Sequence, residues 1–62
     1  MSERRATVPI DGWAGRYDVP VVIVGETPSR YRVRVEWDGY LPHRRYVRRG
    51  DVVLIPKGRV VE

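Results

Sequence analysis

The chain has 62 residues, a net charge of +4 at pH 7, and no Cys. This length predicts a single small domain whose core is barely large enough to keep it folded. The absence of Cys excludes a disulfide framework and a thiolate metal site, so a homodimer is the natural additional source of stability. No apolar run is long enough to span a membrane and no secretory signal is visible, so we expect a cytoplasmic protein without a membrane partner.

Residues 1–14 show the weakest pattern in the chain. Pro9 and the nearby glycines at positions 12 and 15 argue against a helix, so this segment is predicted to be a flexible N-terminal arm that ends in a turn. Trp13 is expected to anchor it by packing over the end of the folded domain.

The first predicted strand covers residues 16–24. It ends in the β-branched run 21–24, which is typical of a buried strand. Pro20 cannot donate a ladder hydrogen bond, so it indicates a bulge, an edge or the start of a strand. Residues 25–29 then provide turn chemistry.

The clearest element is the alternating segment 30–37. Its charged positions are Arg30, Arg32, Arg34 and Glu36, and its uncharged positions are Tyr31, Val33, Val35 and Trp37. Because side chains of a strand point alternately to opposite faces, this pattern predicts a strand with an aromatic and aliphatic inner face and a basic outer face.

Three further segments complete the predicted fold. Asp38-Gly39 is a hairpin signal, but Pro42 would then occupy a position that needs its missing N–H, so a loop over 38–42 and a strand over 43–48 are preferred. Arg49-Gly50 is a second turn, followed by short strands at 52–55 and 60–61. Five short strands separated by Gly and Pro predict an all-β fold, a small barrel over residues 15–62.

Two segments give the chain a resemblance to SH3-like domains. The sequence from Leu54 to Glu62 resembles the SH3 closing segment, in which an Ile-Pro pair, a three-residue 3₁₀ turn and a valine complete the barrel, and Gly15 to Val19 is similar to the opening motif with its Tyr-Asp pair. The resemblance implies a five-stranded SH3-like barrel. It does not imply binding of proline-rich peptides, because Arg59 replaces the tyrosine of the 3₁₀ turn and Trp37 is followed by Asp38 in place of a second tryptophan.

The sequence offers little for catalysis. It has one histidine, His43, two serines, and no glycine-rich phosphate loop or cluster of metal ligands. Glu36, Asp38 and Asp51 have arginines nearby, which favours pairing within the chain over a metal site. We therefore expect a protein that is not an enzyme and has no metal or cofactor.

Positive charge is concentrated in residues 29–49, which carry a net charge of +5 against −1 for the remainder. The candidate binding residues are the arginines of this region: Arg30, Arg32, Arg34, Arg44, Arg45, Arg48 and Arg49. Guanidinium groups suit phosphates, and such a regional concentration is typical of a nucleic-acid footprint. Two alternatives stay open, because an Arg-rich composition can follow from G+C-rich coding and because arginines also form ordinary solvated faces.

Pairing of the 43–48 strand with the 30–37 strand would add Arg45 to the basic face, where neighbouring like charges destabilise a sheet unless an anion covers them. The candidate residues for stacking or docking are Tyr17, Trp37, Tyr40 and Tyr46, with two of the last three expected in the core. The chain has no Asn or Gln, so DNA or RNA would be bound through its backbone with low sequence specificity.

A protein partner is the alternative to nucleic acid. A small barrel without catalytic residues could be a protein-interaction adaptor or a phage-type regulatory protein that docks on an acidic surface of a larger protein. Its contact would be formed by Tyr17, Trp37, Tyr40 and Pro56, with the arginines as a rim.

Overall fold

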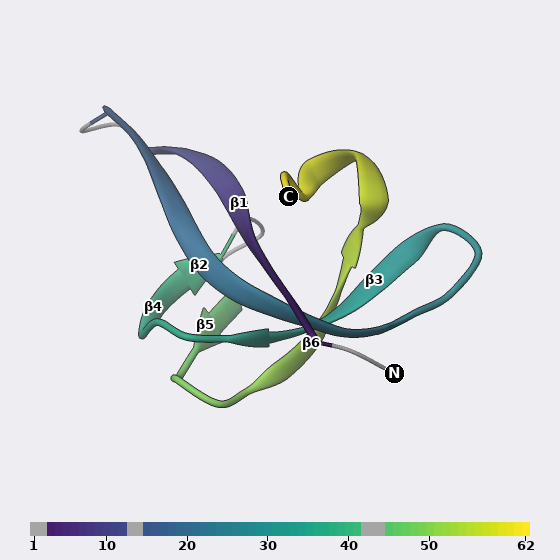
Figure 1. Ribbon diagram of the computed structural model, residues 1–62. Helices are drawn as coiled ribbons and strands as arrows, with labels where there is room; N and C mark the ends of the chain where they lie inside the picture. The colour runs from purple at the N-terminus through teal and green to yellow at the C-terminus, as the bar shows by residue number, and fades with distance from the viewer. Residues whose placement is uncertain (1–2, 13–14, 42–44) are drawn as a thin grey trace.

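The computed structural model describes residues 3–12, 15–41 and 45–62, and for Arg45 only the backbone. The described part is an all-β domain with antiparallel pairing throughout (Figure 1). Its elements are β1 (Arg4–Gly12), β2 (Gly15–Glu26), β3 (Arg30–Val35), β4 (Gly39–Leu41), β5 (Arg45–Val47), β6 (Val52–Pro56) and the 3₁₀ helix η2 (Lys57–Arg59).

The strands form two sheets, a four-stranded sheet in the order β1-β2-β3-β6 and the two-stranded hairpin β4-β5. Each strand of the larger sheet follows its neighbour in the chain, except that the β4-β5 hairpin is inserted between β3 and β6. The expected pairing of the 43–48 segment with the 30–37 strand is therefore wrong. β5 pairs with the nearby β4, which closes a much shorter loop, and β3 pairs with β6.

The core lies on one face of the four-stranded sheet. Its members are the apolar side chains Ala6, Val8, Ile10, Val19, Val21, Ile23, Val33, Val35, Leu41, Val47, Val53 and Ile55. On β3 the alternation holds as predicted: Val33 and Val35 are completely buried, while Arg30 and Arg32 are exposed. The second face of this sheet is therefore the one that carries the β3 arginines.

The N-terminal segment differs from the prediction of a flexible arm. Arg4–Gly12 forms β1, and it places Ala6, Val8 and Ile10 in the core. Pro9 does not interrupt the strand, because its missing N–H faces away from β2. Thr7, two residues earlier and on the same side of the backbone, exchanges hydrogen bonds with Val61 and not with β2.

Pro20 lies within β2, whereas the sequence predicted a bulge, an edge or a strand start at this position. Its carbonyl accepts a hydrogen bond of 3.0 Å from the backbone N–H of Glu36, one residue beyond the end of β3. The missing N–H of Pro20 would face that same point, where the β2-β3 ladder has already ended. The ladder loses no hydrogen bond, so the proline is tolerated.

The expected five-stranded barrel is corrected in two respects. The described residues form six strands, and the sheet does not close into a barrel. The chain end does return to β1, because Val61 and Thr7 exchange two backbone hydrogen bonds of 2.8 Å, but this is an isolated bridge and not a strand. The three-residue 3₁₀ turn implied after Ile55-Pro56 is present as η2.

Candidate nucleic-acid interface

The three arginines of β3 share the outer face of the sheet, but they differ in their surroundings. Arg34 is paired with two carboxylates: its Nη1 lies 3.2 Å from Oε2 of Glu3, and its Nη2 lies 3.3 Å from Oε1 of Glu36. The hydrogen bond to Glu3 is the largest cause of a raised pKa of Arg34, followed by the charge of Glu3 and the hydrogen bond to Glu36. The positive charge of Arg34 is therefore largely neutralised within the protein.

Arg30 and Arg32 make no ion pair with any acidic residue in the described part of the chain. They lie opposite Pro56 and Leu54 of β6, respectively. Together with Val52, Val53 and Leu54 they line a shallow hollow of about 360 Å³. Two of the three arginines on β3 are thus available to an anion.

Arg48 and Arg49 lie in the turn between β5 and β6. Two carboxylates hold this turn by accepting hydrogen bonds from backbone N–H groups: Oδ2 of Asp51 from Arg48 at 2.9 Å, and Oδ1 of Asp38 from Arg49 at 2.6 Å. The predicted pairing of carboxylates within the chain is thus realised in two ways, on the guanidinium by Glu36 and on the backbone by the two aspartates. The side chains of Arg48 and Arg49 are exposed.

The structure does not gather all seven predicted arginines into one row. Three lie on β3 and two in the β5-β6 turn, while Arg44 and the side chain of Arg45 lie outside the described residues.

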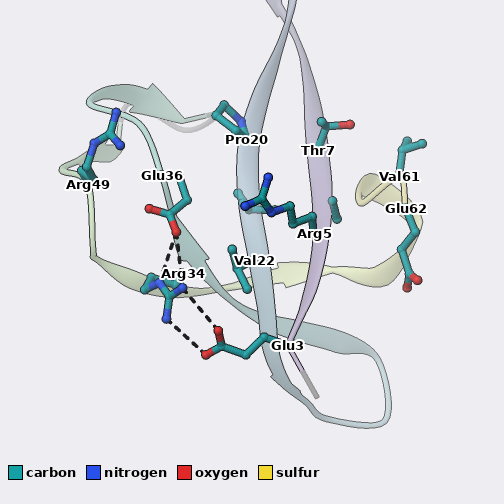
Figure 2. Close-up of a pocket in the computed structure, with 12 residues that line it drawn as sticks. Glu3, Arg5, Thr7, Pro20, Val22, Arg34, Glu36, Arg49, Val61 and Glu62 are labelled. Carbon is teal, nitrogen blue, oxygen red and sulfur yellow. Dashed lines mark hydrogen bonds and ion pairs between the residues drawn. The ribbon is translucent and has the colours of Figure 1, made fainter. Parts of the chain in front are cut away.

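A second, larger hollow of about 850 Å³ lies on the outer face of β1 and β2 (Figure 2). Its charged lining residues are Glu3, Arg5, Arg34, Glu36, Arg49 and Glu62. Acidic and basic side chains are equal in number here, so the hollow has no net attraction for a polyanion. Sequence reasoning missed Arg5 because residues 1–14 were assigned to an arm, although the alternation of Ala6, Val8 and Ile10 was a signal for a strand.

The four candidate aromatic residues are brought together by the fold. The ring centroids of Tyr17 and Trp37 are 5.7 Å apart, and those of Tyr40 and Tyr46 are 5.1 Å apart in an edge-to-face arrangement. The hydroxyl of Tyr17 donates a hydrogen bond of 3.4 Å to the backbone carbonyl of Tyr40, which links the two pairs. We refer to these four residues as the aromatic cluster. Pro56 is not part of it and lies at the end of β6.

The members of the aromatic cluster differ in exposure. Trp37 packs against the core, whereas 62% of Tyr40 and 52% of Tyr46 are exposed. The expectation that two of Trp37, Tyr40 and Tyr46 are core residues is therefore wrong. Tyr40 and Tyr46 are directly opposite each other on β4 and β5, and the neighbouring Leu41 and Val47 are buried on the other face of the hairpin.

Within residues 3–12, 15–41 and 45–62, no group of three or more His, Asp or Glu side chains is placed to hold a metal ion. His43 lies outside this part of the chain. In the same residues, no helix has the length and apolar character needed to cross a membrane.

No protein-family model matches this sequence, and no match was found among curated proteins or among solved structures. A function for the chain is therefore inferred from its own residues.

Proposed function

We propose that this protein is a small, non-enzymatic module of SH3-like architecture that binds single-stranded nucleic acid through its β4-β5 hairpin. Support for the architecture comes from the consecutive hairpins of the larger sheet, the 3₁₀ turn after Ile55-Pro56 and the return of Val61 to β1. Support for the function comes from the outer face of the hairpin.

The observation that carries the proposal is the exposed pair of Tyr40 and Tyr46. The two rings stand on adjacent strands, and more than half of each residue is exposed. The hairpin beneath them is fixed by the burial of Leu41 and Val47 and by the hydrogen bond from Tyr17 to the carbonyl of Tyr40. Exposed aromatic rings on a rigid strand pair are suitable platforms for unpaired bases, which stack on them with little regard to base identity.

The charge of this segment complements the backbone of such a ligand. Residues 39–50 contain four arginines and no acidic residue. The carboxylates nearest to them in sequence, Asp38 and Asp51, are engaged by backbone N–H groups of the β5-β6 turn. Phosphates that follow bases stacked on the tyrosines would therefore meet arginines without competing acidic side chains.

The proposal is tested by the fluorescence anisotropy of labelled 12-nucleotide dT and rU strands at low salt. Replacement of both tyrosines, Tyr40→Ala with Tyr46→Ala, is expected to weaken binding at least tenfold, since each stacked base contributes about 1–3 kcal/mol. The matched variant Tyr40→Phe with Tyr46→Phe keeps both rings and should bind like the wild type. Equal binding by the alanine and wild-type proteins, or no binding to either strand, would contradict the proposal.

The contribution of arginine is measured with two variants that remove one positive charge each. Arg48→Ala, beside the tyrosine pair, is expected to weaken binding and to reduce the slope of log K against log salt by about 0.7, the value for one phosphate contact on a single strand. Arg59→Ala, in η2, should leave the slope unchanged. Equal effects of both changes would indicate attraction by net charge alone, and would contradict a defined interface on the hairpin.

A further inference from the structure

We propose a second binding surface, at the free edge of β6, where an extended acidic peptide segment of a partner protein adds to the sheet as a further strand. This surface is separate from the tyrosine pair and does not depend on the proposed binding of nucleic acid. Three features support it: the direction of the backbone groups of β6, the side chains beside them and the charge of the neighbouring strand.

The direction of the backbone groups follows from the ends of the β3-β6 ladder. The N–H of Val35 donates to the carbonyl of Asp51 at 2.8 Å, and the N–H of Lys57 donates to the carbonyl of Ser29 at 3.1 Å. In an antiparallel pair, hydrogen-bonded residue pairs alternate with non-hydrogen-bonded ones. Given the register of β3 and β6, Val53 and Ile55 therefore bond to β3, whereas the backbone groups of Val52 and Leu54 point to the other side.

That other side is an open edge. β6 pairs with β3 alone among the described strands, and no backbone hydrogen bond from the described residues reaches Val52 or Leu54. Their side chains are 51% and 41% exposed. Natural edge strands are usually protected by Lys, by Pro or by a bulge, and residues 52–55 have none of these. The first such protection is Pro56, at the end of the strand.

The charge of the neighbouring strand selects an acidic occupant. Arg30 and Arg32 line the small hollow together with Val52 and Leu54, and neither arginine has an ion pair in the described part of the chain. An added strand would lie about 9.6 Å from β3, two strand spacings away. An outward Glu and an Arg are long enough to meet over the apolar side chains of β6.

A second copy of this chain is a poor occupant of the same edge. It carries a net charge of +4, and its own β6 contains no acidic residue to face Arg30 and Arg32. Pairing of two β6 strands would thus bury the edge but leave both pairs of arginines without a counter-charge.

The probe is a fluorescein-labelled eight-residue peptide of alternating Glu and Val, compared with a peptide in which Lys replaces Glu. The Glu peptide is expected to bind at least ten times more tightly than the Lys peptide. Arg30→Glu with Arg32→Glu should abolish this preference, whereas Arg59→Glu together with Arg48→Glu, an equal change of net charge elsewhere, should preserve it. Loss of the preference in both double variants would overturn the proposal.

The strand geometry is tested by Leu54→Pro, which removes an N–H that β3 does not use. This variant should fold and lose the peptide. Amide hydrogen exchange of the wild type gives a test that is independent of any variant: the N–H groups of Val52 and Leu54 should exchange rapidly in the free protein and slow at least tenfold with the peptide, while that of Val53 is already slow. Unchanged exchange at Val52 and Leu54, or their protection through self-association without peptide, would overturn the proposal.

The two binding proposals can fail separately. Tyr40→Ala with Tyr46→Ala should leave the affinity for the Glu peptide unchanged, and Leu54→Pro should leave the affinity for the dT strand unchanged. A loss of peptide binding in the tyrosine variant would show that the peptide uses the hairpin face, and would overturn the assignment to β6.

Discussion

The ring of Trp37 lies directly over the α-carbon of Gly39, so close that a Cβ at position 39 would lie 2.1 Å from Cη2 of the indole. Gly39 also has a φ of 157°, a conformation that other residues rarely adopt. This contact holds Trp37 at the start of β4, where it pairs with Tyr17 and connects the β4-β5 hairpin to the larger sheet.

Gly39→Ala should therefore destabilise the protein by about 1–3 kcal/mol, because the indole and the backbone cannot both keep their positions. The free energy of unfolding from urea titration followed by circular dichroism measures the effect. Gly58→Ala is the matched control, since a Cβ there meets no atom within 4 Å, and it should change stability by less than about 0.5 kcal/mol. Equal stability of the two variants would show that the contact is unimportant.

Val33 and Val52 allow the two faces of the sheet to be compared with the same substitution. Val33 is completely buried in the core, whereas 51% of Val52 is exposed. Val33→Ala should reduce the free energy of unfolding by about 2 kcal/mol or more, from lost burial and the cavity that remains. Val52→Ala should change it by about 0.5 kcal/mol or less in the free protein. Similar losses for both would contradict the assignment of the core face.

The ion pair of Lys57 with Glu26 should make stability depend on pH. Nζ of Lys57 lies 2.6 Å from Oε2 of Glu26, and this hydrogen bond is the main cause of a pKa of Glu26 below its ordinary value of 4.5. A carboxylate with a lowered folded-state pKa stabilises the protein above the unfolded pKa, and this stabilisation is lost as pH falls through the folded pKa. Wild type and Glu26→Gln should differ at pH 7.

That difference in the free energy of unfolding should narrow as the pH falls below about 4.5 and vanish well below it. The measurement is a series of urea titrations between pH 7 and pH 2. Asp18→Asn serves as the control, because Asp18 is exposed and makes no ion pair with the described residues. A wild-type advantage over Glu26→Gln that is constant down to pH 2 would rule out the ion pair as its source.

The bridge between Val61 and Thr7 should contribute to stability although it contains a single residue pair. Val61→Pro removes the N–H that donates to the carbonyl of Thr7 at 2.8 Å. We expect a loss of about 1 kcal/mol or more, since that carbonyl then lacks its partner. Thermal unfolding of Val61→Pro and of the control Glu62→Pro measures the difference, and equal melting temperatures would show that the bridge does not hold the chain end.

Local patterns were sufficient for several elements of this fold. The alternation over 30–37 predicted which residues of β3 are buried, and the Arg49-Gly50 turn is present with a positive φ of 96° at Gly50. These predictions succeed because the direction of side chains in a strand and the conformation of a turn depend on neighbouring residues alone.

Features that depend on distant partners were not predictable in the same way. Proline commonly interrupts a strand, but Pro9 and Pro20 each direct the missing N–H to a place where no ladder continues, and only the pairing of β1, β2 and β3 determines those places. Arg34 belongs to the predicted basic row, yet its charge is compensated by Glu3, which is 31 residues away in sequence and is brought near by β1.

The sequence by itself determined the strand character, the face on which the β3 side chains lie and the concentration of arginine between residues 29 and 49, because these follow from composition and from a period of two. Tertiary structure alone decided which arginines keep their charge free, that Tyr17, Trp37, Tyr40 and Tyr46 meet in one cluster, and that β6 is an open edge. The reason is physical: strand pairing joins residues that are far apart in the chain, and many pairings are compatible with the same local pattern.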